Sequence, residues 1–273
     1  MLKQVHIWLL VVATLGWAGI THAQTLEGGA RAVALAGATT ALSAEVWAHA
    51  NPASWAGCQR PMLSFMVSQA YGLEALRLGA VTYVHPTSPA TFALGVRTFG
   101  FEDFRETHLW LGLAKAFYPA SRRPLRLGLS LRYQHVALTR YGSAGVVGIW
   151  GGLQAEVFPW LALGLAATNV NAPRWAGREA LPQTLAIGLA YQPSNRFQLL
   201  LDVLQTMRFA PDFRVGIEVW ALPVLALRAG SGSLPERFTA GFGIALGALE
   251  ADIAAEHHAQ LGWSPALSLS LRL

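Results

Sequence analysis

Apolar and less apolar residues alternate with a period of two along most of the chain after residue 61. In the segment LRLGLSLRY, residues 125–133, every odd position is Leu or Tyr, and every even position is Arg, Gly or Ser. The same alternation recurs in QTLAIGLAY, FRVGIEVW, RFTAGFGIAL and PALSLSLRL. Because successive side chains of a strand point to opposite faces, this pattern predicts strands with one apolar face.

The alternation divides the chain into fourteen predicted strands. They cover residues 62–70, 74–85, 90–99, 106–118, 124–137, 146–158, 160–169, 182–193, 196–205, 212–222, 224–230, 236–246, 248–257 and 264–273. Their length of about ten residues is what a tilted transmembrane strand needs, and short turns alternate with longer polar connections. We therefore predict an all-β fold, a transmembrane antiparallel outer-membrane β-barrel of about 14 strands with an N-terminal plug or hatch segment.

A soluble β-sandwich would alternate as well, and composition favours the barrel. The chain is 53% hydrophobic and only 13% charged, whereas ordinary globular domains are about 25% charged. The less apolar face is made of Gly, Ala, Ser and Arg, which suits a lumen better than bulk water. Aromatic residues recur near strand ends, as interfacial girdles require, although Trp110, Trp150 and Trp220 fall on the inner face of the pattern.

The N-terminus has the pattern of a cleavable secretory signal peptide. Lys3 precedes an apolar run from Ile7 to Ile20, and Thr21-His22-Ala23 forms a small-x-small site. An uncleaved membrane anchor is the alternative, but such a helix needs about 20 apolar residues. The predicted division is a signal peptide over residues 1–23, a plug or hatch over 24–60 and the barrel over 61–273.

Charge and reactive side chains exclude several function classes. The formal net charge is +5, and the basic residues are dispersed rather than clustered, so no nucleic-acid partner is expected. The single cysteine, Cys58, excludes an internal disulfide and a cysteine-based metal site. No G-x-S-x-G or H-E-x-x-H motif occurs, and His257-His258 is interpreted as part of a solvated loop. We expect no enzyme activity, no cofactor and no metal site.

The segment GARAVALAGATTALSAEVWAHANPASWA, residues 29–56, resembles the N-terminal segment of FadL-related outer-membrane barrels, especially of the PorV/PorQ branch. The family pattern reads roughly Gly-Ala-Arg-Ala-x-Ala-Leu-Gly-Gly-Ala, then Thr-Ala-Leu and, ahead of the first strand, Asn-Pro-Ala. The resemblance implies a lumenal hatch that includes Arg31, Gly37, Asn51, Pro52 and Ala53. Ser43-Ala44-Glu45 stands where the family usually has paired acidic residues.

The resemblance implies two functions, both in the outer membrane of a Gram-negative bacterium and in contact with its lipid. The first is a component associated with type IX secretion, which binds or tethers exported proteins and has cargo or secretion-machinery proteins as partners. The alternative is FadL-like transport of a hydrophobic small-molecule ligand across the outer membrane. A purely structural barrel is a third possibility.

The charged residues on the inner face of the pattern are the remaining candidate site. Charge on the lipid face would cost about 2–4 kcal/mol for Arg at mid-membrane, so we expect the charged residues to face the lumen. The set comprises Arg126, Arg132, Glu156, Asp202, Arg214, Glu218, Arg228, Arg237, Glu250, Asp252 and Arg272. These residues could line a polar pathway, or they could form a network of ion pairs that fixes the wall and the hatch.

Overall fold

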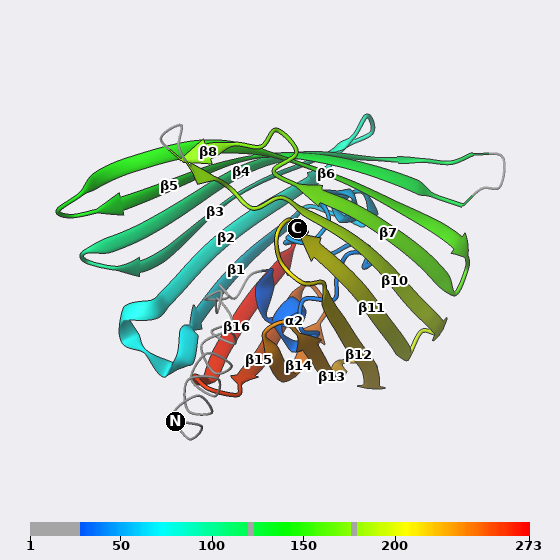
Figure 1. Ribbon diagram of the computed structural model, residues 1–273. Coiled ribbons are helices and arrows are strands. Elements are labelled where there is room, and N and C mark those ends of the chain that lie inside the picture. The colour runs from blue at the N-terminus through cyan, green and yellow to red at the C-terminus, as the bar shows by residue number, and fades with distance from the viewer. Residues whose placement is uncertain (1–27, 120–122, 176–178) are drawn as a thin grey trace, which may run out of the picture.

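The computed structural model of this protein describes residues 28–119, 123–175 and 179–273 (Figure 1). Within these residues, fourteen antiparallel strands close into one barrel, in which each strand pairs with its neighbours in the chain. The first strand pairs with the last and closes the barrel, with Met62 opposite Arg272. This confirms the predicted all-β fold, an antiparallel barrel of fourteen strands. The predicted signal peptide, residues 1–23, lies outside the described residues.

The barrel strands follow the predicted alternation closely. They are β1 (Met62–Gln69), β2 (Arg77–Pro86), β3 (Thr91–Phe101), β4 (Phe104–Phe117), β5 (Leu125–Leu138), β6 (Gly142–Phe158), β7 (Leu161–Thr168), β10 (Thr184–Ser194), β11 (Phe197–Thr206), β12 (Asp212–Leu222), β13 (Leu225–Ser233), β14 (Glu236–Leu246), β15 (Leu249–His258) and β16 (Gly262–Arg272). The longest connection, over residues 169–183, leaves the same end of the barrel as the connections over 70–76 and 207–211, whereas β4 and β5 are joined at the other end by residues 118–124. In outer-membrane barrels the longer loops are external, so we call this the external end.

Three segments differ from the prediction. His257 and His258, interpreted above as part of a solvated loop, are the last two residues of β15, and His258 is only 6% exposed. The second predicted strand began at residue 74, but two short 3-10 helices, η2 (Ala70–Gly72) and η3 (Glu74–Leu76), precede β2. The chain turns sharply there, since Tyr71 has a positive φ of 56°. The long connection after β7 holds a small hairpin of β8 (Arg174–Trp175) and β9 (Glu179–Ala180), which is too short to give a periodic signal.

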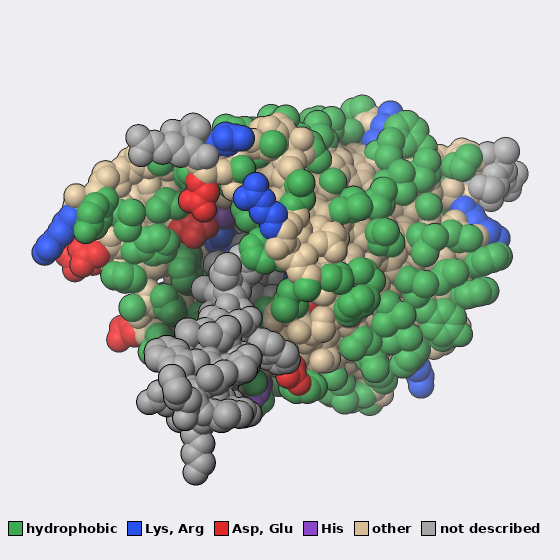
Figure 2. Space-filling view, viewed as in Figure 1, with side chains coloured by type: hydrophobic (Ala, Val, Ile, Leu, Met, Phe, Trp, Pro, Cys, Tyr) green, Lys and Arg blue, Asp and Glu red, His purple; other side chains and the backbone are tan. Residues whose placement is uncertain are grey.

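The outer face of the wall is apolar. Alternate residues of the strands, such as Leu109, Leu111 and Leu113 of β4, are 45–63% exposed on it. Figure 2 shows hydrophobic side chains spread over the wall. An apolar surface of this extent is one that lipid covers. The expectation that charged residues avoid this face is wrong for Lys115, which is exposed near the end of β4 and lies over the Phe117 ring, where its long stem can reach the membrane interface.

Residues 28–60, called here the lumenal segment, lie inside the barrel (Figure 1). The segment contains a short helix, α2 (Gly29–Ala34), and a 3-10 helix, η1 (Pro52–Gly57). Helix α2 packs on β13 to β16, and η1 packs on β3 to β6. Ala30, Leu35, Ala53 and Trp55 are fully buried, so the centre of the molecule is built from this segment. In the described part of the chain, no helix is long and apolar enough to cross a membrane.

Candidate functional site

The lumenal segment fits against glycines of the wall. A side chain at Gly112 would collide with the Trp55 ring, and one at Gly152 would collide with the Asn51 amide. The same holds for glycines of further strands that face the segment, namely Gly128, Gly164, Gly188, Gly216, Gly230 and Gly241. The small residues on the inner face of the wall therefore leave the space that the lumenal segment occupies.

Asn51 joins the segment to the wall through its side-chain amide. Its Oδ1 accepts a hydrogen bond from the Ala53 backbone N–H at 3.0 Å and so caps η1. Its Nδ2 donates to the Leu153 and Leu165 carbonyls of the wall at 3.0 and 3.3 Å. It also donates to the Thr40 carbonyl at 2.8 Å, and Asn51 is fully buried. Pro52 starts η1 at the position where the missing N–H of proline costs nothing.

Ion pairs fix α2 to the opposite wall. Arg31 donates through Nε and Nη2 to both carboxylate oxygens of Glu218, at 2.9 and 2.8 Å. Arg228 donates to Glu218 and to Asp252, in each case at 2.5 Å. Bidentate guanidinium–carboxylate pairs are among the strongest polar contacts in proteins, so this chain of charges specifies where the helix sits.

Glu45 is a second acidic neighbour of Arg31, at 3.7 Å. Burial raises the pKa of Glu45 to about 7, because the loss of solvation outweighs the attraction of the Arg31 guanidinium. The attraction of Glu218 and Glu45 in turn raises the pKa of Arg31 against the opposing effect of its burial. Arg31 stays charged, whereas Glu45 takes up a proton near neutral pH.

Glu45 therefore makes stability depend on pH. The folded state holds the Glu45 proton up to a pH of about 7, whereas the unfolded state releases it near 4.5. The contribution of Glu45 to the free energy of unfolding falls as the pH rises through this window, by up to roughly 3 kcal/mol. Urea unfolding in micelles from pH 4.5 to 7.5 should show a smaller pH dependence for Glu45→Gln than for the wild type. Identical slopes for the two proteins would contradict this assignment.

The structure places the predicted lumenal charges in pairs or on the segment. Arg126 contacts Glu156 at 2.6 Å, and Arg272 contacts Glu250 at 3.0 Å. The others are brought together around the segment, in the contacts Arg214–Asp212, Arg237–Asp212, Arg237–Glu256 and Asp202 with the Thr40 backbone N–H. Ion pairing thus dominates among them, and Arg132 and Arg214 also line a cavity.

Of the predicted hatch residues, Arg31 and Asn51 make the contacts described above. Gly37 has a positive φ of 73°, and its carbonyl accepts a hydrogen bond from Arg214 at 3.4 Å. Pro52 and Ala53 lie against Gly128 of β5. All of these residues lie in the lumen, and their role as a hatch stays a prediction.

A cavity of about 940 Å³ lies between the lumenal segment and the external connections. Trp47, His49 and Ala50 of the segment line its inner end, and Leu181, Phe209 and Pro235 line its external end. Met66, Leu78 and Ala80 add an apolar patch. The volume is in the range of small-molecule binding sites, about 300–1,000 Å³, which are also mostly apolar with a few polar groups.

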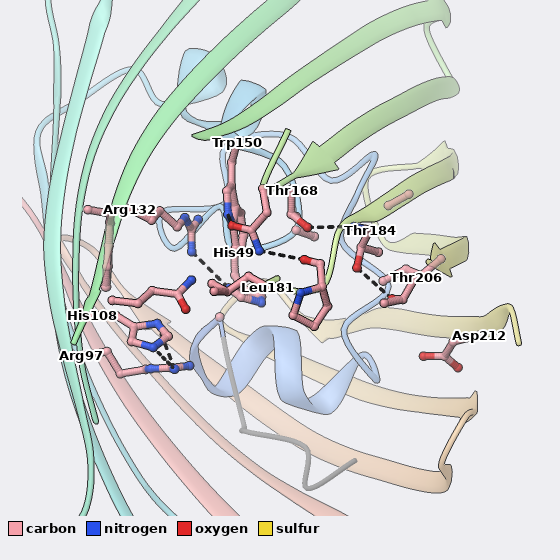
Figure 3. Close-up of a pocket in the computed structure, with 18 of the residues that line it drawn as sticks. His49, Arg97, His108, Arg132, Trp150, Thr168, Leu181, Thr184, Thr206 and Asp212 are labelled. Atoms are coloured by element: carbon pink, nitrogen blue, oxygen red, sulfur yellow. Dashed lines mark hydrogen bonds between the residues drawn. The ribbon is translucent and has the colours of Figure 1, made fainter. Parts of the chain in front are cut away.

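One wall of this cavity carries arginine, histidine and tryptophan (Figure 3). The Arg132 guanidinium carbon lies 3.5 Å from the centroid of Trp150 and 5.9 Å from that of Trp110. Arg132 Nη1 is 3.4 Å from His49 Nδ1. Below it, Arg97 Nη2 lies 3.1 Å from both Glu106 Oε1 and His108 Nδ1.

A second cavity opens in the wall itself. It is lined by the ends of β1, β2 and β3 with β15 and β16, and its lining includes both lumenal Ser68 and membrane-facing Val67 and Leu267. Leu78 lines both cavities and is 4% exposed. Its side chain therefore stands between the lumen and this opening in the wall.

Sequence reasoning missed several cavity residues. Arg97 continues the series Thr91, Ala93 and Gly95, which faces inward on β3. The alternation could therefore have identified Arg97 as a lumenal residue. His49 lies in the lumenal segment, which has no period, and no sequence signal places it beside Trp150. Among the described residues, no group of three His, Cys, Asp or Glu side chains could hold a metal ion.

Solved structures of outer-membrane channels share this fold. The Ralstonia pickettii toluene transporter TbuX superposes with a TM-score of 0.66 at 12% identity, over 91% of this chain and 99% of that one. The Pseudomonas putida toluene transporter TodX gives 0.60 at 14%, over 92% and 98%. A Pseudomonas aeruginosa FadL homologue gives 0.60 at 11%, over 90% and 98%. No protein-family model and no curated protein matches the sequence.

These likenesses establish the fold: a closed 14-strand barrel of the kind found in Gram-negative outer membranes. Together with the apolar outer face, they place the chain among outer-membrane barrels by fold.

Proposed function

We propose that this chain is a FadL-related channel that carries hydrophobic small molecules across the outer membrane. The observation that carries the proposal is the cavity of about 940 Å³, which lies between the external connections and the lumenal segment inside the wall. Its apolar patch and its rings would hold a ligand taken from the outside. The proposal includes no catalytic step and no cofactor.

In this proposal the lumenal segment is the plug of the channel. It fills the barrel beneath the cavity and is fixed by Asn51 and by the Arg31–Glu218 pair. A ligand in the cavity therefore has no straight route along the barrel axis past the segment. The second cavity supports a sideways route, since Leu78 is the one residue in the described part of the chain that lines both cavities.

The solved structures support this role better than the secretion-associated role, because two of them are toluene transporters. The likeness of residues 29–56 to the PorV/PorQ branch stays a prediction, as does a link to type IX secretion.

Blocking the cavity tests the proposal. Ala186 of β10 lines the cavity and is 5% exposed. Ala186→Trp should place an indole ring in the cavity and reduce the uptake of radiolabelled naphthalene well below the wild-type rate. The measurement is the initial uptake rate in a Gram-negative host that lacks its own channels of this type.

Ala229→Trp is the matched control, because Ala229 of β13 is exposed on the outer face. It should leave uptake unchanged at equal amounts of folded barrel. Wild-type uptake by Ala186→Trp, or no uptake above background by the wild type, would refute the proposal.

A further inference from the structure

We propose that the second cavity, in the outer face of the wall, binds lipid A, the phosphorylated glycolipid of the outer leaflet of Gram-negative outer membranes. A lipid phosphate would lie at Arg77 and Arg105, which both line this cavity, and the acyl chains would lie against its apolar part. The site is separate from the proposed transport function and does not depend on it.

The charged part of the cavity is one row of residues across three strands. Gly100 of β3 pairs with Arg105 of β4. The β2–β3 pairing ends one residue after Arg77, at Leu78, so Arg77 lies beside Gly100. Both arginines thus stand on the outward face with a glycine between them. Neighbouring strands lie about 4.8 Å apart, so the two Cα atoms are about 10 Å apart and the long side chains can close on one phosphate.

The acidic residues near this row leave the arginines able to take a phosphate. Arg77 contacts Glu74, but the two side chains are 64% and 80% exposed. Such exposed ion pairs contribute little, so a lipid phosphate can replace Glu74. Glu102 and Asp103 lie on the turn beyond Arg105, and no acidic residue is among the described residues that line the cavity.

The apolar part of the cavity is a second row, two residues further from the external end. Ile253, Leu267 and Val67 pair in succession across β15, β16 and β1, and they are 46–57% exposed on the outer face. Gly79 of β2 continues the row beside Val67. Within 4 Å, a Cβ at Gly79 would meet only Thr98 Oγ1, at 3.9 Å. The wall is therefore hollow next to the apolar side chains, and an acyl chain can lie there.

The order of the two rows along the strands fits an amphiphile from the outer leaflet. The arginine row lies at the external end of the wall, next to the connections over residues 70–76 and 102–103. The apolar row lies about 7 Å deeper, at about 3.4 Å per residue. Lipid headgroups lie at the interface and their chains lie beneath them, so phosphate would meet arginine and the chains would meet the apolar row. This lipid would cover the place where the proposed sideways route leaves the wall.

Native mass spectrometry of the full-length protein in detergent micelles tests the assignment. The probes are lipid A, fully dephosphorylated lipid A and phosphatidylglycerol, each titrated into delipidated protein. Because arginines attract anionic lipid and donate charge-assisted hydrogen bonds to phosphate, lipid A should bind at least about tenfold more tightly than its dephosphorylated form. It should also bind more tightly than phosphatidylglycerol, which has fewer chains to cover the apolar row.

A double variant assigns the effect to the arginine row. Arg77→Gln combined with Arg105→Gln should weaken lipid A binding about tenfold or more and leave binding of the dephosphorylated form unchanged. The matched control is Arg140→Gln combined with Arg174→Gln, because both of these arginines are exposed at the external end and lie outside the cavity. This control should bind lipid A as the wild type does.

A second variant tests where the chains lie. Gly79→Leu should fill the hollow and weaken the binding of lipid A and of its dephosphorylated form alike. Gly151→Leu is the matched control, since Gly151 of β6 pairs with outward-facing Leu129 and has open space around it. It should leave the binding of both forms unchanged.

Equal affinities for lipid A and its dephosphorylated form would overturn the assignment, as would phosphatidylglycerol binding as tightly as lipid A. An unaffected arginine double variant, or Gly79→Leu binding lipid A as tightly as Gly151→Leu does, would overturn it as well. None of these outcomes changes the naphthalene uptake results, which test the transport function separately.

Discussion

Asn51→Ala combined with Pro52→Ala is expected to raise the ion conductance of the barrel in planar bilayers from a nearly closed level to a clearly open one. The double change removes the Asn51 hydrogen bonds to Leu153 and Leu165 of the wall and to Thr40 of the segment. It also removes the Asn51 cap on the Ala53 backbone N–H, at a cost of about 0.5–2 kcal/mol. The segment that fills the lumen should then loosen and admit water and ions.

Pro193→Ala combined with Asn195→Ala is the matched control, because both residues are exposed where β10 turns into β11. This double variant should keep the wild-type conductance. If the Asn51 and Pro52 variant also stayed closed, the lumenal segment would not be the barrier that we propose.

Arg228→Leu is expected to lower the free energy of unfolding by about 3–5 kcal/mol, the usual result of breaking a buried ion pair from one side. The Arg228 side chain is 1% exposed, and it contacts both Glu218 and Asp252 at 2.5 Å. Its removal leaves two buried carboxylates without this cation. Urea unfolding in micelles measures the loss.

Two further variants separate burial from charge. Adding Asp252→Asn to Arg228→Leu should recover a large part of the loss, since Glu218 keeps Arg31 at 2.8 Å. Arg272→Leu removes a pair whose arginine is 43% exposed, so it should cost less than about 1 kcal/mol. Equal losses for Arg228→Leu and Arg272→Leu would contradict a structural role for the buried network.

The wall could be predicted from the sequence because its signal is local. Each strand alternates by itself, and lipid on one side and the lumen on the other keep the two faces chemically distinct. The departures occur where a second influence acts: Lys115 can reach the membrane interface, and residues 70–76 turn at the end of β1. The β8–β9 hairpin has only two residues in each strand, too few for a period.

The site was harder to predict because its contacts join distant parts of the chain. The alternation indicated that Glu218 and Arg228 face inward, and their pairing follows from the register of one hairpin. The contact of Glu218 with Arg31 spans 187 residues and depends on how the lumenal segment folds. The cavity arises only when that segment, β1 to β7, β10 to β12 and the external connections are assembled.

The close fit between the lumenal segment and the wall glycines constrains how such a protein can evolve. Trp55 lies against Gly112 and Asn51 against Gly152. A large side chain on the lumenal segment therefore requires a glycine at the facing position of the wall. A mutation that enlarges either partner is tolerated only if the other shrinks. The lumenal segment and the wall must therefore change together during evolution. A lumenal segment transplanted from a distant homologue would need a matching set of glycines in the wall.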